Sequence, residues 1–194
     1  MPKTSIVLAS SSRYRRELLQ RLGLAFESWS PEIDEHPLPA EPPRETAIRL
    51  ARAKAEAGAR KFPSAWIIGS DQVADLDGRA IGKPGTFENA RSQLRDVSGH
   101  SVLFHTALCL WNARQERRHE RLVTTEVGFR RLTDAEIERY LEREHAFDCA
   151  GSAKSEGLGI SLLSRLGGED PTALVGLPLI ALAAMLRAEG FDVP

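Results

Sequence analysis

Two short apolar runs, at residues 5–9 and 65–69, place the strongest constraint on the fold of this chain. Each is too short for a stable helix and passes directly into a polar cluster, which is typical of a short buried strand. Helical patterns separate the two runs, one at residues 13–21 that Gly23 stops and an alanine-rich one at residues 44–60. Short buried strands that alternate with helices predict a mixed α/β domain, with a twisted central sheet flanked by helices.

The rest of the chain continues this alternation and contains no repeat, low-complexity tract or linker. Asp77-Gly78 is a strong hairpin signal, and Thr133 to Glu136 is a capping box that opens a helix. A proline-rich acidic segment at residues 31–43 can be neither helix nor central strand. Further strands are expected at residues 25–29, 101–111 and 122–129, the last two joined by a solvated hairpin tip, and further helices at residues 87–97, 133–144 and 177–189. We expect one domain over residues 1–194 and leave open whether it forms two lobes with a cleft between them.

Composition limits the classes of partner. The 194 residues are 42% hydrophobic, enough for a core, and their formal net charge of -1 gives no overall attraction to nucleic acid or an anionic membrane. Cys109 and Cys149 form no disulfide framework and have no zinc-like spacing. The N-terminal apolar run is too short for a signal peptide, and Gly176 and Pro178 interrupt the longest apolar stretch. We expect a cytoplasmic protein that binds neither nucleic acid nor membranes, so any anion site must be local.

Three consecutive serines and three arginines follow the first expected strand, in the stretch L-A-S-S-S-R-Y-R-R. At such a helix start, the backbone N–H groups and the positive end of the helix dipole point to one place, and hydroxyl and guanidinium groups add donors for phosphate oxygens. Ser10, Ser12 and Arg15 therefore belong to a candidate anion site. The alternative is a serine cap followed by arginines on a solvated helix face, and the stretch alone does not decide between the two.

A second polar cluster, Gly69-Ser70-Asp71-Gln72, is expected at the end of the strand at residues 65–69. Open α/β sheets bind ligands at the carboxyl ends of their strands. Asp71 could orient or deprotonate a water molecule there, or hold a divalent cation. A turn aspartate that bonds its own backbone is the alternative.

Two further segments place charged residues in restricted or glycine-rich backbone. Lys83 lies in a tight Gly-Lys-Pro-Gly connection, which favours a lysine aimed at a ligand, although the spacing does not match a Walker loop. Lys154 and Glu156 lie in a loop with glycines at 151, 157 and 159, a pattern that suits closure over a ligand. Lys54, in the middle of the helix at residues 44–60, reads as a surface lysine from its own neighbourhood.

In combination, these segments resemble the Maf-like family of nucleoside triphosphate pyrophosphatases, in the family's order and over nearly the whole chain. The residues that carry the resemblance are Ser10-x-Ser12-x-x-Arg15, Asp34-Glu35, Lys54, Ser70-Asp71, Gly82-Lys83-Pro84, Ser98-Gly99, Ala150-Gly151 and Val175-Gly176-Leu177-Pro178. Within the family, S-D-Q-V and C-A-G-S-x-K-S-E-G resemble the subgroup that hydrolyses 7-methyl-GTP. The dTTP and UTP subgroup has threonine at position 72 and glutamine at position 156. The resemblance implies an α/β fold of the Maf and inosine-triphosphatase type.

The resemblance also implies a role for each polar group. A set of hydroxyl and cationic residues would bind the triphosphate and stabilise charge that develops between its α and β phosphorus atoms. These are Ser10, Ser12, Arg15, Lys54 and Lys83. Asp71 would be the base for the attacking water. The family needs a divalent cation, Mg²⁺ or Mn²⁺, for which Asp34, Glu35 and Asp71 are the candidate ligands, and it implies a homodimer.

Three positions would select the base by this resemblance: Tyr14, Gln72 and Glu156. An N7-methylated guanine carries a positive charge and stacks well on an aromatic face, whereas the arginine of the dTTP pattern at position 14 would repel it. Glu156 can accept from the guanine N1–H and amino group while its charge balances the methylated ring, and Gln72 offers an amide. The 7-methyl-GTP pattern has tryptophan at position 14, so tyrosine gives a smaller stacking face.

The leading hypothesis is an enzyme that hydrolyses 7-methyl-GTP to 7-methyl-GMP and diphosphate and so clears a modified nucleotide from the pool. The same reaction on dTTP and UTP, or on another damaged nucleotide, is the alternative among enzymes. A nucleotide-binding regulator of cell division or septum formation is the alternative from another class. Asp71 argues against a regulator, because sequestering a triphosphate requires cations but no base.

Overall fold

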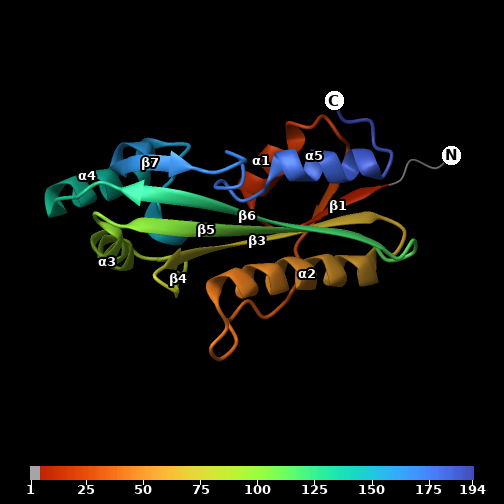
Figure 1. Ribbon diagram of the computed structural model, residues 1–194, viewed down its shortest axis with the longest axis horizontal. Coiled ribbons are helices and arrows are strands. Elements are labelled where there is room, and N and C mark those ends of the chain that lie inside the picture. Colours follow the sequence, from red (N-terminus) through yellow and green to blue (C-terminus); the bar gives the residue numbers. More distant parts are fainter. Residues whose placement is uncertain (1–4) are drawn as a thin grey trace.

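The computed structural model describes residues 5–194, in which seven strands form one mixed sheet (Figure 1). The strand order is β2-β1-β3-β5-β6-β7, and the short β4 pairs with the end of β3. β1 is parallel to both of its neighbours, and the other pairs are antiparallel. The strands are β1 (Ile6–Ala9), β2 (Glu27–Trp29), β3 (Trp66–Leu76), β4 (Arg79–Ile81), β5 (Ser101–Asn112), β6 (Arg117–Phe129) and β7 (Leu163–Gly167). The expected mixed α/β class is confirmed.

Five α-helices flank the sheet within the described residues, and each end lies within two residues of its expected position. The helices are α1 (Arg13–Gln20), α2 (Pro43–Lys61), α3 (Phe87–Val97), α4 (Asp134–Glu144) and α5 (Leu179–Ala188). Side-chain caps begin α1 at Ser12 and α4 at Thr133, which forms the expected capping box with Glu136. Two short 3₁₀ segments, η1 (Ala150–Ser152) and η2 (Leu158–Leu162), follow α4. Among residues 5–194, no helix combines the length and the apolar character that crossing a membrane requires.

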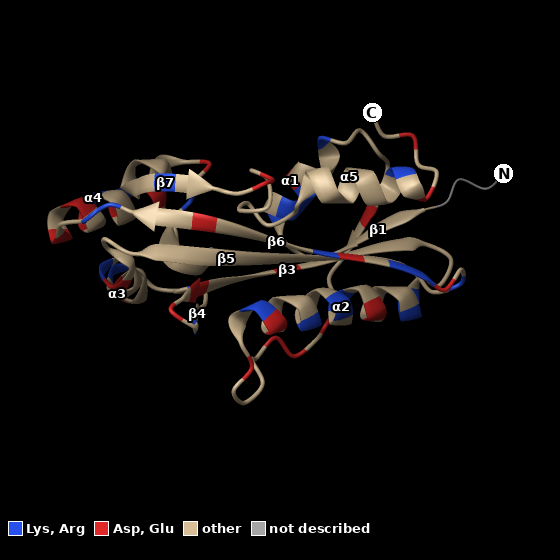
Figure 2. Ribbon diagram, in the orientation of Figure 1, with Lys and Arg blue, Asp and Glu red and all other residues tan. Residues whose placement is uncertain are grey.

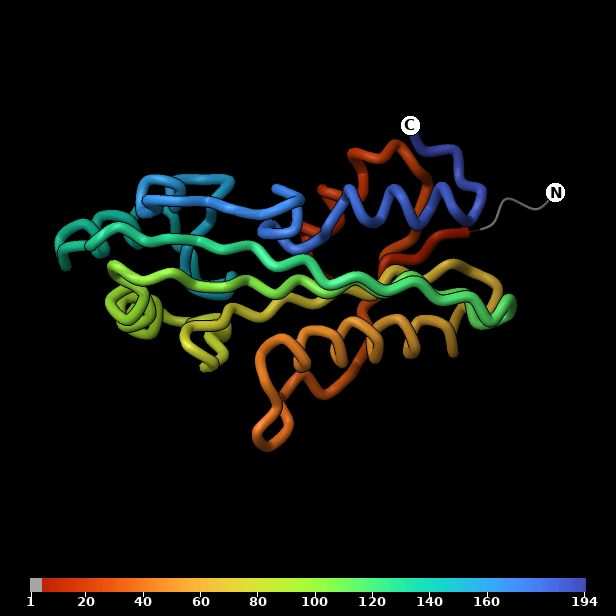
Figure 3. The backbone as a smooth tube through the Cα atoms, in the orientation of Figure 1, coloured from red at the N-terminus to blue at the C-terminus, as the bar shows by residue number. Residues whose placement is uncertain are grey.

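Two strands are longer than the sequence indicates, and β7 lies where a loop was expected. β3 continues through Asp71 to Leu76, and β6 begins at Arg117 rather than near residue 122. The cause is the long β5–β6 hairpin, because β5 pairs with β3 over residues 67–75 and with β6 along its whole length (Figure 3). This pairing overrides the weak strand propensity of the polar residues. Asp71 therefore lies within a strand, and the expectation that β3 would stop at residue 69 was wrong.

The helices cover the two ends of the sheet differently (Figure 1). At one end α1 and α5 pack on one face and α2 packs on the opposite face, whereas α3 and α4 pack at the other end of the long strands. The buried apolar residues form three clusters, which we call the α1–α5 core, the α2 core and the α3–α4 core. β3 contributes Ile68 to the first, Ile67 to the second and Ala74 to the third. The middle of β3 therefore lies where the three cores meet.

Charged residues of both signs are interspersed over the surface. Lys and Arg alternate with Asp and Glu along α2 and near the tip of the β5–β6 hairpin (Figure 2). This distribution agrees with the small net charge of the chain. Long-range attraction of a polyanion is therefore weak, and binding one depends on a local group of cations.

Candidate active site

A gap in the pairing of β3 lies where the parallel part of the sheet meets the antiparallel part. One edge of β3 pairs with β1 at residues 66–68 and with β4 at residues 74–76, while the other edge pairs with β5. Between β1 and β4, residues 69–73 have no strand partner on this edge within the described part of the chain. The start of α1 therefore borders the gap on one side, the connection after β4 borders it on the other, and Asp71 lies within it.

Lys54 connects two carboxylates at this gap. Its Nζ atom lies 2.6 Å from Asp71 Oδ1 and 2.7 Å from Glu35 Oε1. The Lys54 and Asp71 side chains are 7% and 11% exposed, whereas Glu35 reaches them from a loop and is 59% exposed. Partial burial alone would raise the pKa of Glu35, but the hydrogen bond from Lys54 brings it below its ordinary value, and the charges of Lys83 and Arg15 add to this lowering. The lysine that reads as a surface residue is thus the buried centre of the cluster.

Small residues let α2 approach β3 closely enough for this contact. A Cβ atom on Gly69 of β3 would overlap the carbonyl oxygen of Ala51 and lie 2.7 Å from the backbone nitrogen of Ala55. On the helix side, a Cβ atom on Gly58 would lie 2.5 Å from a methyl carbon of Ile67. The alanine-rich pattern of α2 therefore serves close packing against the sheet, and this packing brings Lys54 over Asp71.

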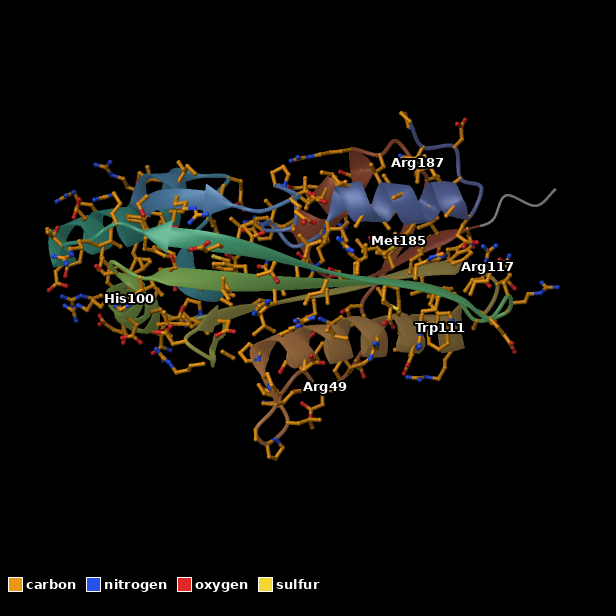
Figure 4. The ribbon with its side chains drawn as sticks, viewed as in Figure 1. Arg49, His100, Trp111, Arg117, Met185 and Arg187 are labelled. Atoms are coloured by element: carbon orange, nitrogen blue, oxygen red, sulfur yellow. The ribbon has the colours of Figure 1, made fainter. Side chains whose placement is uncertain are left out.

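The proline-rich segment that carries Glu35 is anchored to α2. Arg49, labelled on α2 in Figure 4, donates to both carboxylate oxygens of Glu41 at 2.6 and 2.8 Å and to the carbonyl of His36 at 3.0 Å. The Thr46 hydroxyl also donates to Glu41, at 2.9 Å. These hydrogen bonds, that of Arg49 foremost, hold the pKa of Glu41 at about 2. The loop is therefore tied down beside Lys54 although it lacks regular structure.

The serines and Arg15 form a connected group at the start of α1. Ser12 is the N-cap and accepts from the backbone N–H of Arg15 at 3.4 Å, and Ser10 Oγ accepts from the backbone N–H of Ser12 at 3.1 Å. The Arg15 guanidinium donates to Ser10 Oγ at 3.4 Å and to the carbonyl of Gly176 at 2.8 Å. Burial lowers the pKa of Arg15, and the two carboxylates of the Lys54 cluster oppose that shift. Ser12 therefore caps the helix, whereas Arg15 turns toward Ser10 and Gly176 instead of lying on a solvated helix face. Binding of an anion by this group stays a prediction.

Lys83 approaches from the other side of the gap. It follows β4 in an exposed turn, and its charge contributes to the low pKa of Glu35. The turn is held in place by Asn89 of α3, whose side-chain amide donates to the carbonyl of Pro84 at 2.9 Å. Lys83 and Arg15 therefore add positive charge near Glu35, which Lys54 contacts directly.

Gln72, one of the three expected base-selecting residues, is committed to internal contacts. Its Nε2 atom donates to Thr106 Oγ1 at 2.9 Å and to the carbonyls of Ala173 and Leu174 at 2.9 and 3.0 Å. Because side chains alternate along a strand, Gln72 points to the sheet face opposite Asp71. Its amide nitrogen thus shapes the loop at residues 173–176 rather than the group around Lys54.

Tyr14, another of the expected base-selecting residues, contacts a residue that the sequence did not single out. The Tyr14 hydroxyl donates to Asp148 Oδ2 at 3.1 Å, and the Arg13 guanidinium lies over the Tyr14 ring, 4.7 Å from its centroid. Asp148 Oδ1 lies 3.1 Å from the Nζ atom of Lys154, which precedes the exposed Glu156 by two residues. No sequence pattern selected Asp148, because nothing distinguishes this acidic residue before the Cys-Ala-Gly motif from other surface acids.

The loop at residues 173–176 is a second part of the site to which the sequence assigned no role. The carbonyl of Gly176 accepts from Arg15 and lies 3.1 Å from the hydroxyl of buried Ser70. That hydroxyl has one hydrogen, which it shares with the carbonyl of Ala107 at 2.8 Å. Gly176 has φ of 117°, a conformation that favours glycine. The Gly176 carbonyl therefore connects α1 to β3. In the sequence, this loop was marked only by the Val-Gly-Leu-Pro segment of the family resemblance.

Two of the three candidate metal ligands are adjacent. Glu35 and Asp71 share the ammonium of Lys54, whereas Asp34 Oδ1 contacts the backbone nitrogen and ring of His36 at 3.0 and 2.6 Å. Within residues 5–194, no group of three or more His, Cys, Asp or Glu side chains is placed to hold a metal. Mg²⁺ that accompanies a nucleotide takes most of its ligands from phosphates and water and needs only one or two carboxylates. The Glu35 and Asp71 pair fits an ion of that kind.

Together, the fold and the site define a class of protein: three cations around two carboxylates suit a polyanionic substrate and a reaction that involves a proton. The sequence model of the family described as "Maf-like protein" matches residues 5–189, and the chain belongs to that family. It is 58% identical over 194 residues to the 7-methyl-GTP pyrophosphatase of Xanthomonas axonopodis pv. citri (strain 306), with both chains covered in full. A protein of the same name from Xanthomonas oryzae pv. oryzae (strain MAFF 311018) is 57% identical with the same coverage. The one from Burkholderia thailandensis is 56% identical over 195 residues, covering 97% of this chain and 91% of the relative. The family resemblance read from the sequence is confirmed.

Proposed function

We propose that this chain hydrolyses 7-methyl-GTP between the α and β phosphates and releases 7-methyl-GMP and diphosphate. The observation that carries the proposal is the Lys54 cluster, in which one buried ammonium joins Asp71 and Glu35 at the gap of β3. A site that binds a triphosphate needs several cations close together, and Arg15 and Lys83 meet that need on a protein of small net charge. The relatives at 56–58% identity, which carry the name 7-methyl-GTP pyrophosphatase, support the choice of substrate.

Asp71 is the base in the proposed reaction. Its carboxylate accepts a proton from a water molecule, the water oxygen bonds to the α phosphorus, and the bond from that phosphorus to the α–β bridging oxygen breaks. Lys54 orients Asp71, and with Arg15 and Lys83 it stabilises the negative charge that passes to the departing diphosphate. In this proposal, the buried Asp71 and Lys54 carry out the chemical step.

The start of α1 supplies donors for the phosphate oxygens. Ser10 Oγ accepts from the backbone of Ser12 and from Arg15, so its own hydroxyl hydrogen is directed away from these donors. The unpaired backbone N–H groups of the first helical turn add to it. We propose that Ser10, Ser12 and Arg15 hold the triphosphate while Asp71 acts on the water.

We propose that Glu35 and Asp71 are the protein ligands of Mg²⁺ or Mn²⁺ that arrives with the nucleotide. Such an ion neutralises phosphate charge when bound. Asp34 is a weaker candidate than these two, because its carboxylate is engaged with His36. A cytoplasmic location, which is expected from the composition and the N-terminal pattern, and a homodimer, which the family resemblance implies, stay predictions.

We propose that Tyr14 and Glu156 contact the base and that Gln72 acts indirectly. Tyr14 provides an aromatic face for the cationic ring, and Glu156 provides an exposed carboxylate in the loop that follows η1. Gln72 holds the carbonyls of the loop at residues 173–176, and this loop in turn positions Arg15.

The test is diphosphate release from a panel of nucleoside triphosphates by the purified protein with Mg²⁺ or Mn²⁺. We expect 7-methyl-GTP to give the highest kcat/KM, ahead of GTP, dTTP and UTP, and we expect a chelator to abolish turnover. Faster hydrolysis of dTTP or UTP would contradict the assignments of Tyr14 and Glu156 while the reaction class holds. Tight binding of 7-methyl-GTP without any turnover would contradict the enzyme itself and favour a regulator.

A further inference from the structure

Asp148 lies between two parts of the molecule that pack separately. The connection between α4 and η1 carries Asp148, and its neighbours Phe147 and Cys149 pack against the α3–α4 core. Tyr14 belongs to α1, whose Leu18 is buried in the α1–α5 core. The hydrogen bond from Tyr14 to Asp148 therefore joins the two ends of the sheet, across 134 positions of sequence.

Both carboxylate oxygens of Asp148 interact with side chains where the two ends of the sheet meet. Oδ2 accepts from the Tyr14 hydroxyl at 3.1 Å, and Oδ1 lies 3.1 Å from the ammonium of Lys154, whose side chain is only 10% exposed. The Tyr14 hydroxyl in turn accepts from Arg13 at 2.7 Å, so its single hydrogen is directed to Asp148. Partial burial alone would raise the pKa of Asp148, but the hydrogen bonds from Lys154 and Tyr14 bring it below its ordinary value. At neutral pH the Asp148 carboxylate is therefore ionised, and both of its oxygens can accept hydrogen bonds.

This arrangement limits where the Tyr14 ring can lie. A tyrosine side chain can occupy several χ1 rotamers, and the hydrogen bond to Asp148 favours the rotamer that brings the hydroxyl to the segment that leads to Glu156. The Arg13 guanidinium covers one face of the ring, so a base stacks on the other face or displaces Arg13. The position of the stacking face relative to Glu156 thus depends on Asp148.

We propose that Asp148 is a positioning residue for base selection, which holds the Tyr14 ring in register with the Glu156 segment so that both can contact one methylated guanine. This inference rests on the proposed function, because Tyr14 and Glu156 select a base only if the substrate is a nucleotide. Asp148 itself acts through Tyr14 and has no part in the chemical step.

The test is a double-mutant cycle on the full-length protein with Asp148→Ala, Tyr14→Phe and the combination. Tyr14→Phe keeps the stacking ring and removes only the hydroxyl. For each single variant we expect KM for 7-methyl-GTP to rise about fivefold to tenfold, the scale of one partly exposed hydrogen bond of ordinary strength, with kcat within about twofold. The preference for 7-methyl-GTP over GTP should fall, and the double variant should be no worse than the worse single variant.

Asp134→Ala is the matched control. Asp134 is an exposed acid outside the site that pairs with Arg95 at 2.7 Å, and its loss should leave both KM and the base preference unchanged. Additive losses in the cycle, a fall in kcat at constant KM, or an equal effect of the control would each overturn the inference. If Asp148→Ala fails to fold, Asp148→Leu replaces it in the same cycle, because leucine has a branched side chain of similar length and accepts no hydrogen bond.

The outcome for Asp148 can be separated from the outcome for the proposed function. If the wild-type protein prefers another nucleotide to 7-methyl-GTP, the proposed substrate is wrong, and the cycle is then measured on the preferred nucleotide. Non-additive losses in KM there still support Asp148 as a positioning residue, and additive losses there overturn it.

Discussion

The two ends of the candidate site differ in how deeply their ion pairs are buried. We call the group of Lys54, Asp71 and Glu35 the phosphate end, and the group of Tyr14, Asp148, Lys154 and Glu156 the base end. At the phosphate end both members of the Lys54–Asp71 pair are buried, with side chains 7% and 11% exposed, and the 59% exposed Glu35 joins them from a loop. The ion pair of the base end has only one buried member, because Asp148 is 51% exposed and its partner Lys154 is 10% exposed. An ion pair in a buried place is held in one geometry by the packing around it, and an exposed pair contributes little to stability and can rearrange.

This difference separates chemistry from selection. Every nucleoside triphosphate has the same triphosphate, so the groups that act on it can be rigid and preorganised. The base differs between substrates, and in the proposed function it is contacted by the partly exposed Tyr14 on α1 and the exposed Glu156 on a loop between α4 and β7. Substitutions at the phosphate end should therefore change kcat and the stability of the fold, and those at the base end should change which nucleotide is preferred.

Asp71→Asn should have the largest effect, because it removes the proposed base and keeps the size of the side chain. We expect kcat to fall by about 10²–10⁴-fold with little change in KM, measured as diphosphate release from 7-methyl-GTP. Asp96→Asn is the control, since Asp96 is an exposed acid that pairs with Arg79 at 3.0 Å away from the gap. A fall of less than tenfold in Asp71→Asn would mean that another group activates the water.

Gly69→Ala tests whether close packing of α2 sets up the phosphate end. The added Cβ atom would overlap backbone atoms of α2, so we expect the free energy of unfolding to fall by about 1–3 kcal/mol and activity to fall with it. Denaturant unfolding measures the first change and diphosphate release measures the second. Gly167→Ala in β7 is the control, because the nearest atom to its Cβ would be 3.7 Å away. Unchanged activity in a destabilised Gly69→Ala protein would separate α2 packing from catalysis.

Glu156→Gln should change selection and leave the chemical step intact. The amide no longer balances the charge of the methylated ring, so we expect the ratio of kcat/KM for 7-methyl-GTP over GTP to fall about threefold to tenfold, with the maximal rate within about twofold. Glu142→Gln, at an exposed position on α4, should change neither quantity. If Glu156→Gln lowers the maximal rate on both nucleotides equally, the base end takes part in chemistry and the comparison fails.

Glu41→Gln should have the smallest effect, and its effect should depend on pH. The pKa of Glu41 in the folded protein is about 2, below its ordinary value of 4.5, so its stabilising contribution is complete above pH 4.5 and is lost as the pH falls toward 2. The melting temperature of the wild type should therefore exceed that of Glu41→Gln by a constant amount from pH 5 to pH 9. That difference should shrink below pH 4.5, and a constant difference down to pH 3 would contradict the role assigned to Glu41.

Much of the fold was accessible from the sequence, because helix signals act over short distances. Thr133 and Glu136 form a capping box within one turn, and the alanine pattern of α2 spans the whole helix. The end of β3 was not accessible in this way. Residues 70–76 become strand because β5 returns to pair with them, and their own polar character gave no sign of it.

The site residues also fall into those that local sequence patterns indicate and those that only long-range packing reveals. Ser10, Ser12, Arg15 and Asp71 could be selected from local patterns and family resemblance, and the sequence by itself determined the helix start, the short buried strands and the membership of the Maf family. Only the tertiary structure decided that Lys54 is buried between two carboxylates, that Gln72 faces away from Asp71, and that Asp148 reaches Tyr14. Local propensity and capping involve a few neighbouring residues, whereas burial of a charge and a contact over 134 positions depend on how distant segments pack.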